Sequence, residues 1–410
     1  MTNFLKVIIK ILNKIKGIGN NLVYYRKIIF YLFRKGGIRR VYKFLWTKSF
    51  VFAGGEGTGC WVGSILIPFF KLFPNLTRLF IGFPQVVEIE VTTRCNKKCI
   101  ICEHTYWKEP NKDLTFTEFK NIIANFPKLK WVNLTGEGDA FLNKDYLKMI
   151  EYLKKRDVYV ALVDSFDLIN KEIAEKLITL GVDVIYISFD AGTKETYEKI
   201  KVGCNFKKTI NNIRTLLELK RKYNSPIPVI YFRYIVNKLN LYEMEKFLEI
   251  VHSFDKDLLG IGSTIEFTGL LYFPEIEELF IPKIPDNIVK KVIKKAEDLD
   301  LKISFVHPTH PKNLPPMHYC YAWQEPYIMM GGHVMPCCAV LMSNKRDFLR
   351  KHAFGNIFEK SFKEIWFSER YKNFRKMVIS KREKVPILCA GCRAYNTIER
   401  EEKYGVSEKV

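Results

Sequence analysis

Acidic residues are almost absent from the first fifth of this 410-residue sequence. Residues 1–80 contain fourteen Lys or Arg and a single acid, Glu56, although the whole chain carries 44 Asp or Glu against 66 Lys or Arg. A segment of one charge sign indicates contact with an anionic surface. Nucleic acid is disfavoured, because Ile, Leu, Phe and Tyr alternate with the basic residues, a mixture typical of segments that lie on lipid headgroups.

The N-terminal segment also lacks a cleavable signal peptide and a clear membrane span. The apolar run over residues 22–33 is interrupted by Arg26 and Lys27, so it is too short and too charged to span a bilayer. The five glycines within residues 49–70 favour a loop or a re-entrant segment over a spanning helix. Residues 4–16 place lysines on one helical face and aliphatic residues on the other. We therefore predict that residues 1–84 lie peripherally on the cytoplasmic face of a membrane. A helical cap on the protein's own core, or a surface for a partner, is the alternative.

Cysteine is scarce, and eight of the ten cysteines fall into two groups whose spacing suits metal ligands in a reducing compartment. The other two, Cys60 and Cys204, are interpreted as ordinary small apolar residues. The composition is 48% hydrophobic and 27% charged, which indicates a globular rather than a disordered chain.

The first cysteine group consists of Cys95, Cys99 and Cys102, and it follows the strand-like run Val86–Val91. Three thiolates on one loop can bind a metal centre, and no fourth cysteine stands near them. An open position suits an iron that chelates a small molecule, whereas a structural zinc site is normally closed. A zinc knuckle completed by His104 is the alternative.

The spacing C-x3-C-x2-C after a strand resembles the cluster motif of the radical S-adenosylmethionine (radical SAM) enzymes. The resemblance implies that Cys95, Cys99 and Cys102 hold a 4Fe–4S cluster whose remaining iron binds S-adenosylmethionine (SAM), with Ile101 near the adenine. One electron, from a donor such as ferredoxin or flavodoxin, would cleave SAM to methionine and a 5′-deoxyadenosyl radical. That radical would abstract hydrogen from an unactivated C–H bond. The cofactor carries this chemistry, so we assign no catalytic acid or base.

From residue 85 onward, short β runs alternate with amphipathic helical stretches, which predicts parallel βαβ units and an α/β fold. The resemblance implies a partial (β/α)6 barrel over residues 85–310 with its site at the C-terminal strand ends. The expected strands are Val86–Val91, Trp131–Leu134, Val158–Val163, Val184–Phe189, Val229–Ile235 and Leu259–Ile265. Helices are expected near 116–126, 145–156, 170–180, 206–223, 241–253 and 286–299.

Glycines follow the second expected strand, where backbone can approach a ligand closely. The resemblance places a Gly-Gly-Glu-Pro-like motif here that holds the methionyl amine of SAM. Gly136, Gly138 and Asp139 occupy that motif, with Asp139 in place of the Glu and Ala140 in place of the Pro. These two departures alter the expected contact with the amine.

Polar residues also end the fourth and fifth expected strands. The resemblance implies that Ser188 and Asp190 occupy positions whose polar side chains contact the ribose or the methionyl carboxylate of SAM. Arg233 carries a charge suited to pairing with that carboxylate. The alternatives are that Ser188 and Asp190 cap the helix beginning near Thr193, and that Arg233 makes a structural ion pair.

The second cysteine group follows a proline-dense stretch, which we take as the start of a last domain over residues 311–410. Gly331 and Gly332 predict a β-hairpin, and the run after Phe362 predicts a helix. Together with the first motif, this part resembles the SPASM extension of radical SAM enzymes. The resemblance implies one auxiliary 4Fe–4S cluster held by Cys320, Cys389, Cys392 and either Cys337 or Cys338, with Cys338 favoured. A zinc ribbon is the alternative.

The basic N-terminal segment makes a membrane lipid or lipid-linked molecule the first substrate hypothesis, with carbon–carbon bond formation on a hydrocarbon chain as one possible outcome. Modification of a peptide or protein side chain is the second hypothesis, since related SPASM enzymes often act on peptides. Modification of a sugar is the third. A non-enzymatic adaptor with zinc at both cysteine groups represents a different class of protein altogether.

Overall fold

The computed structural model describes residues 26–42, 83–260, 264–270, 273–306, 325–343, 345–379, 384–390 and 403–408. The expected helix over residues 4–16 and the glycine-rich residues 49–70 lie outside these ranges, as do Cys60, Cys320 and Cys392. In the described ranges, no helix combines the length and the apolar character needed to cross a membrane.

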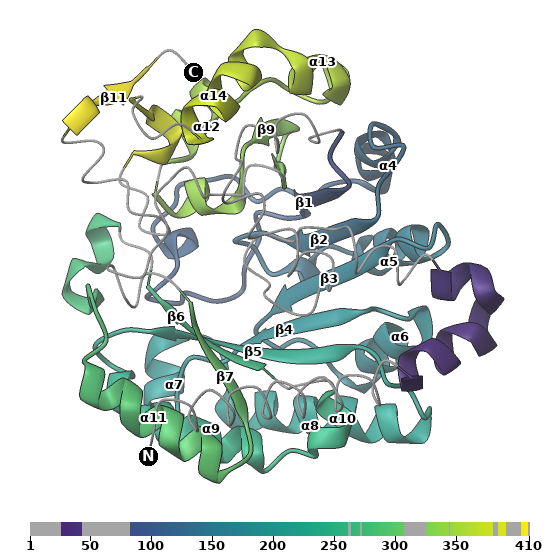
Figure 1. Cartoon of the computed structure of the whole chain (residues 1–410), viewed down its shortest axis with the longest axis vertical. Helices are drawn as coiled ribbons and strands as arrows, with labels where there is room; N and C mark the ends of the chain where they lie inside the picture. Colours follow the sequence, from purple (N-terminus) through teal and green to yellow (C-terminus); the bar gives the residue numbers. More distant parts are fainter. Residues whose placement is uncertain are drawn as a thin grey trace, which may run out of the picture.

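A nine-stranded sheet in the order β7-β6-β5-β4-β3-β2-β1-β8-β9 forms the centre of the fold (Figure 1). Neighbouring strands from β7 to β1 are all parallel, so the predicted α/β barrel-type fold is confirmed. The parallel strands are β1 (Val86–Glu90), β2 (Trp131–Thr135), β3 (Tyr159–Asp164), β4 (Val184–Ser188), β5 (Val229–Val236), β6 (Thr264–Gly269) and β7 (Lys302–Val306).

The first five strands match their predicted positions, whereas the sixth begins later than expected. Leu259 ends the short helix α10 (Lys256–Leu259), so β6 starts only at Thr264. The seventh strand, β7, was not among the six predicted strands. The partial barrel therefore has one more parallel strand than the six expected.

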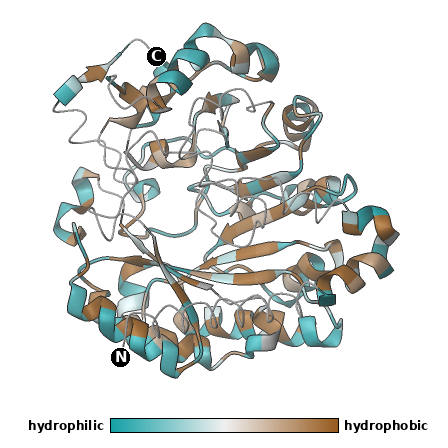
Figure 2. Cartoon of the chain, in the orientation of Figure 1, coloured by the Kyte–Doolittle hydropathy of each residue, from teal (hydrophilic) through white to brown (hydrophobic). Residues whose placement is uncertain are grey.

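Helices pack on the outer side of the sheet. Figure 1 shows α7 to α11 along β4–β7. Figure 2 shows strands β4 and β5 as hydrophobic over most of their length, while the helices mix hydrophobic and hydrophilic residues. The helices are α4 (Phe116–Ala124), α5 (Tyr146–Lys154), α6 (Lys171–Leu180), α7 (Lys194–Ile200), α8 (Phe206–Lys222), α9 (Met244–His252) and α11 (Asp286–Asp298). Their boundaries follow local signals, such as the capping box of Thr115 and Glu118 before α4.

The inner side of the sheet is apolar where the strands begin. Val86, Trp131 and Val184, each the first residue of its strand, form a core cluster with Ile28 and Leu32 of the helix over residues 26–42. This helix, purple in Figure 1, therefore covers the end of the barrel at which the strands start. For residues 26–42 the structure matches the alternative of a helical cap on the protein's own core.

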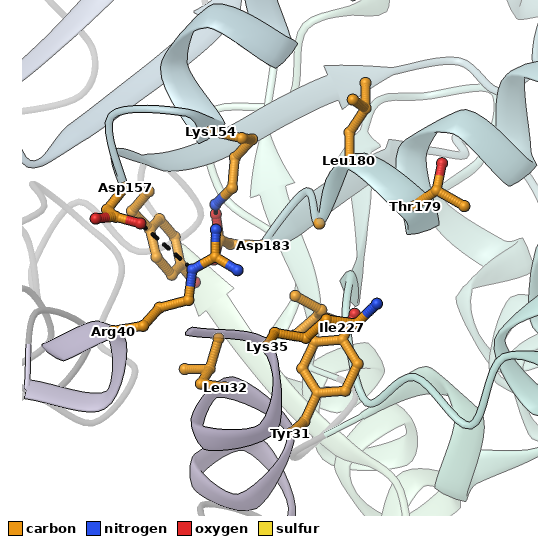
Figure 3. A pocket seen from close by; sticks show the side chains of 12 residues that line it. Tyr31, Leu32, Lys35, Arg40, Lys154, Asp157, Thr179, Leu180, Asp183 and Ile227 are labelled. Carbon is orange, nitrogen blue, oxygen red and sulfur yellow. Dashed lines mark hydrogen bonds and ion pairs between the residues drawn. The ribbon is translucent and has the colours of Figure 1, made fainter. Parts of the chain in front are cut away.

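A hollow lies between this cap helix and the loops that precede the strands. It measures about 700 Å³, including space open to solvent. Arg40 from the cap helix is 3.3 Å from Asp157, and Lys154 pairs with Asp183 on the opposite wall (Figure 3). The cap is thus attached to the barrel by the Arg40–Asp157 ion pair as well as by apolar contacts.

The C-terminal part continues the same sheet. Strand β8 (Tyr327–Met329) pairs in parallel with β1, and β9 (His333–Met335) pairs antiparallel with β8, which confirms the predicted hairpin. A Cβ at Gly332 would lie 2.5 Å from the Phe358 ring, so the turn requires glycine. Beyond the hairpin lie α12 (Arg346–His352), α13 (Phe362–Phe367) and α14 (Glu369–Ile379), and α13 confirms the helix expected after Phe362.

Candidate functional site

The first cysteine group lies on the loop that leaves the C-terminal end of β1. Cys95, Cys99 and Cys102 are partly buried free thiols. Two backbone hydrogen bonds hold the loop against the segment after α7, from the Lys98 amide to the Val202 carbonyl (2.8 Å) and from the Ile100 amide to the Ile200 carbonyl (2.9 Å). Burial raises the pKa of all three thiols. A positively charged iron centre would favour the thiolate forms and offset that shift.

Two buried lysines, which the sequence analysis did not single out, support this loop. Lys97 pairs with Asp139 after β2, and Lys201 lies 2.7 Å from Asp190 after β4. The positive charge of Lys201 opposes the rise in the pKa of the Cys99 thiol. The cysteine loop is therefore fixed by residues from two other strand ends.

The donor set fits an iron–sulfur cluster better than a zinc knuckle. His104, the proposed fourth zinc ligand, has its Nε2 2.8 Å from the Thr93 carbonyl oxygen, and this contact leaves its Nδ1 without a partner. Within the described ranges, no three His, Cys, Asp or Glu side chains are arranged to hold a single metal ion. Three cysteines without a fourth protein ligand are what a cluster with one open iron requires.

Gly138 lets the turn after β2 pack directly against the cysteine loop. A Cβ at Gly138 would lie 2.4 Å from the Thr92 carbonyl oxygen and 2.7 Å from that of Arg94. Gly136 packs in the same way on Glu90, whose Cγ would be 2.9 Å from an added Cβ. These glycines let the turn after β2 pack on the end of β1 and the start of the cysteine loop, and the predicted contact with SAM stays a prediction.

Asp139 has a different immediate environment from the one expected. Its carboxylate pairs with Lys97 and accepts a hydrogen bond from the Phe141 amide (3.1 Å). The pair ties the turn after β2 to the cysteine loop. Binding of the methionyl amine by Asp139 therefore stays a prediction, and Asp139 already has a positioning role for the loop.

Polar residues on β4, β5 and β6 form one row across the sheet. Ser188 is in register with Arg233 on β5, and Arg233 is in register with Glu266 on β6. Lys201 donates to the Ser188 hydroxyl (3.0 Å), and Arg233 pairs with Glu266 (3.2 Å). The alternative of a structural ion pair for Arg233 is thus observed.

Helix capping by Ser188 and Asp190 is not observed, because the N-cap of α7 is Thr193. Asp190 instead accepts from the Ile235 amide (2.7 Å) on β5. Ile101 is buried in an apolar cluster with Ile200 and Phe273. The SAM contacts of Ser188, Asp190, Arg233 and Ile101 stay predictions.

A buried ion pair joins the barrel to the C-terminal part. Glu90, the last residue of β1, accepts from Arg346 Nη2 at 2.8 and 2.6 Å, and from the Met330 amide at 2.7 Å. The Arg346 guanidinium lies 4.3 Å from the centre of the Trp107 ring. This pair was missed from the sequence, since its two residues are 256 positions apart.

Two further carboxyl groups, Glu103 and Glu137, lie beside this pair. Burial raises the pKa of Glu103 to about 8. Burial raises the pKa of Glu137 well above its usual range, and the charge of Glu103 adds to that shift. The only sequence signal for Glu137 was its place between Gly136 and Gly138.

The second cysteine group is only partly described. Cys337 and Cys389 are partly buried and pack on the main core, while Cys338 is exposed. Cys320 and Cys392 lie outside the described ranges. The proposed ligand set, including the choice of Cys338 over Cys337, stays a prediction.

Comparison with known proteins connects these features to a family. The radical SAM superfamily model matches residues 89–251, and the model of the SPASM iron–sulfur cluster-binding domain matches residues 320–393. The chain is 25% identical over 303 residues to a tungsten-containing aldehyde ferredoxin oxidoreductase cofactor-modifying protein from Pyrococcus furiosus, covering 70% of this chain and 82% of that protein. It is 28% identical over 220 residues to a probable GTP 3′,8-cyclase from Saccharolobus islandicus, covering 51% of this chain and 67% of that protein.

Solved structures show the same fold. SuiB from Streptococcus suis bound to SAM superposes with a TM-score of 0.60 at 14% identity, covering 83% of this chain and 80% of SuiB. SuiB bound to its precursor peptide SuiA gives a TM-score of 0.58 at 13% identity, covering 91% of this chain and 90% of SuiB. Native anSMEcpe with bound AdoMet and a peptide gives a TM-score of 0.53 at 16% identity, covering 72% of this chain and 84% of anSMEcpe.

The chain thus combines a parallel α/β barrel, a cysteine loop at its C-terminal edge and a cysteine-bearing extension, which defines a cluster-dependent enzyme. It belongs to the radical SAM superfamily and carries a C-terminal SPASM domain. Its cofactors are SAM and 4Fe–4S clusters.

Proposed function

We propose that this protein uses Cys95, Cys99 and Cys102 to hold the cluster that binds SAM, and that it modifies a water-soluble substrate by hydrogen abstraction. When bound, the cluster and SAM supply a 5′-deoxyadenosyl radical that removes hydrogen from an unactivated C–H bond. The protein's own residues fix the loop, bind the substrate and exclude water. The observation that carries this proposal is the cysteine loop held by backbone from α7 and by Lys97 and Lys201.

The position of the cap helix argues against a lipid chain as the substrate. The helix over residues 26–42 covers the end of the barrel where strands begin, whereas the cysteine loop leaves the other end. Strands of five to eight residues separate these ends, a distance of roughly 16–26 Å at about 3.3 Å per residue. A membrane touching this helix would not present an acyl chain to the cysteine loop, so the lipid hypothesis lacks support from the fold.

A peptide is the substrate class that we favour. SuiB bound to its precursor peptide matches 91% of this chain, whose C-terminal part pairs through β8 with β1, the strand that leads into the cysteine loop. The relatives from Pyrococcus and Saccharolobus are named for two different substrates, a cofactor and GTP. Similarity in sequence therefore supports radical chemistry but does not select one substrate. The hypothesis that the substrate is a sugar stays a prediction.

We further propose peripheral docking of the cap helix on an anionic membrane. Its outward side exposes Phe30 (56%), Phe33 (53%), Ile38 (71%) and Tyr42 (61%). Arg26, Lys27, Arg34, Lys35 and Arg39 are exposed on the same helix, which has no acidic residue. This mixture suits insertion of aromatic side chains between anionic headgroups. Docking would locate the enzyme in the cell without delivering its substrate.

Formation of 5′-deoxyadenosine tests the proposed chemistry. Anaerobically reconstituted protein with dithionite and SAM should produce 5′-deoxyadenosine, and Ala at any of Cys95, Cys99 or Cys102 should abolish it. Cys204→Ala is the matched control, because Cys204 is a buried thiol outside the motif and should not affect production. Production that survives loss of the three motif cysteines would rule out the assignment.

A further inference from the structure

Two buried carboxyl groups in the site lie within hydrogen-bonding reach of each other and have no other side chain as a hydrogen-bond partner. Glu103 directly follows Cys102, and Glu137 lies between the two glycines after β2. Each residue is 8% exposed, and apart from the contact between the two carboxyls their four oxygens have no side-chain hydrogen-bond partner. Buried polar atoms are normally satisfied, so a group of this kind calls for a missing partner.

Arg346 faces the same place with unused donors. Its Nη2 is bound by Glu90, but its Nε and Nη1 are buried without a partner. The charge of Arg346 acts on both Glu103 and Glu137, so the guanidinium lies near both carboxyls. Because Glu90 already balances Arg346, the two other carboxyls have no counter-charge of their own, in keeping with the raised pKa of each.

These unpaired groups describe the chemistry of a missing ligand. A metal ion is a poor match, since no three suitable side chains converge in the described part of the chain. An ammonium group needs only acceptors for its three N–H donors, which four carboxyl oxygens supply. The free N–H groups of Arg346 need an oxygen acceptor on the same ligand.

We propose that Glu103, Glu137 and Arg346 bind a primary ammonium group of the substrate together with a neighbouring carbonyl or carboxylate oxygen. The proposal rests on the proposed function, and it specifies the substrate as an amine-bearing peptide or a similar amine. A lysine side chain or an N-terminal residue presents both groups.

The location favours the substrate over SAM as the ligand. Glu103 belongs to the first cysteine loop, whereas Arg346 lies eight positions after Cys338, on the first turn of α12. A molecule held by both would lie between the first cysteine loop and α12. The polar row of Ser188, Lys201 and Arg233 remains at the β4 and β5 ends for the methionyl carboxylate.

Two small probes that differ only in the ammonium group test this site. N-acetyl-L-lysine methylamide and N-acetyl-L-norleucine methylamide would be compared by ligand-observed NMR on full-length, anaerobically reconstituted, SAM-loaded protein. We expect the lysine probe to bind about tenfold more tightly, the gain typical of a hydrogen bond to a charged group. Glu103→Gln and Glu137→Gln should each reduce this ratio, and the double variant should bring it close to one.

Glu277→Gln is the matched control, since Glu277 is an exposed acid on the nearby segment Pro274–Leu279 and should leave the ratio unchanged. Equal binding of the two probes by the wild-type protein, or a preference that persists in the double variant, would overturn the proposal. Loss of the SAM-induced spectral change at the cluster in Glu137→Gln would overturn it too, because the carboxyl would then serve SAM. Absence of 5′-deoxyadenosine with a retained preference for the lysine probe would refute the proposed chemistry but not this site.

Discussion

The two ends of the barrel are built from different interactions. Where the strands begin, aromatic side chains pack closely, with the Trp131 and Tyr159 rings 4.2 Å apart, and the cap helix covers them. Where the strands end, buried ion pairs dominate, among them Lys97 with Asp139 and Arg346 with Glu90. One end is closed by apolar burial and the other is organised by charge.

This difference separates stability from chemistry. Apolar burial stabilises a fold without demanding exact geometry, whereas a buried ion pair loses hydration and gives little net stability. Charged pairs at the strand ends therefore contribute most by fixing positions, and they surround the cysteine loop. We expect substitutions at the two ends to have separable effects on stability, on SAM cleavage and on membrane binding.

The largest effect on stability is expected at the Glu90–Arg346 pair. Arg346→Leu would leave Glu90 buried without its counter-charge, which should lower the free energy of unfolding by about 3–5 kcal/mol. Chemical denaturation measures the loss, and hydrogen exchange of α12 locates it. Arg350→Leu is the control on the same helix, because Arg350 is partly exposed and its surface pairs should contribute less than about 1 kcal/mol. Similar losses for both variants would contradict a special role for the buried pair.

A buried lysine near the beginning of β5 should control how stability depends on pH. Lys220 on α8 donates to the Pro228 carbonyl, and burial lowers its pKa to about 7 from 10.5. Between these pH values the unfolded chain binds one more proton than the folded chain, so this residue makes stability rise with pH.

Lys220→Met should therefore raise the free energy of unfolding by roughly 3 kcal/mol at pH 6 and flatten its increase between pH 7 and 10. Denaturation at several pH values measures both changes. Lys222→Met is the control, since Lys222 is exposed. Production of 5′-deoxyadenosine by the Lys220 variant should stay at the wild-type level. If the pH dependence of stability were unchanged in this variant, Lys220 would not be buried as described.

Much of the barrel and the first cysteine group could be predicted from sequence, because their signals are local. The helix predicted at 170–180 is observed at Lys171–Leu180, where Asn170 caps its first turn and Gly181 ends it. The cysteine loop was recognisable because its three ligands lie within eight residues. Strand β7 was missed because five residues between a helix and a proline-rich stretch carry too little pattern.

The contacts that organise the site could not be predicted, because they join distant residues. Lys97 and Asp139 are 42 positions apart, and no periodicity marks either as the partner of the other. The pairing of Arg233 was foreseen as an alternative, but Glu266 as its partner depends on the register of β5 with β6. Likewise, the sequence of residues 22–33 is an apolar run with charges inside it. Only the packed structure shows which side of the helix over residues 26–42 faces the barrel.

Gly138 should be the most sensitive glycine for SAM cleavage. An added methyl group would meet two carbonyl oxygens of the cysteine loop at 2.4 and 2.7 Å, so the loop would have to shift. A displacement of about 1 Å in a catalytic arrangement can lower the rate about 100-fold. We therefore expect Gly138→Ala to lower 5′-deoxyadenosine production to that extent in a single-turnover assay.

Gly36→Ala is the matched control at the other end of the barrel. Its added methyl group would meet only the flexible side chain of Arg40, within the cap helix. Production of 5′-deoxyadenosine should not change. If both alanine variants were equally active, tight packing of the turn after β2 would not matter for the cysteine loop.

The smallest effect is expected from the outward side of the cap helix. Phe33→Ser should lower partition onto vesicles with phosphatidylserine by about tenfold, since burial of an aromatic side chain is worth roughly 1.5–3 kcal/mol and the headgroup region gives only part of it. Arg34→Gln should weaken the free energy of vesicle binding by about 1 kcal/mol, and this loss should disappear at high salt. Phe367→Ser is the control, because Phe367 is 45% exposed but lies on α13 in the C-terminal part.

Because the helix and the cysteine loop occupy opposite ends of the barrel, both cap variants should keep full 5′-deoxyadenosine production in solution. Parallel loss of vesicle binding and of SAM cleavage would show that the two ends are coupled, and it would return a membrane-borne substrate to consideration.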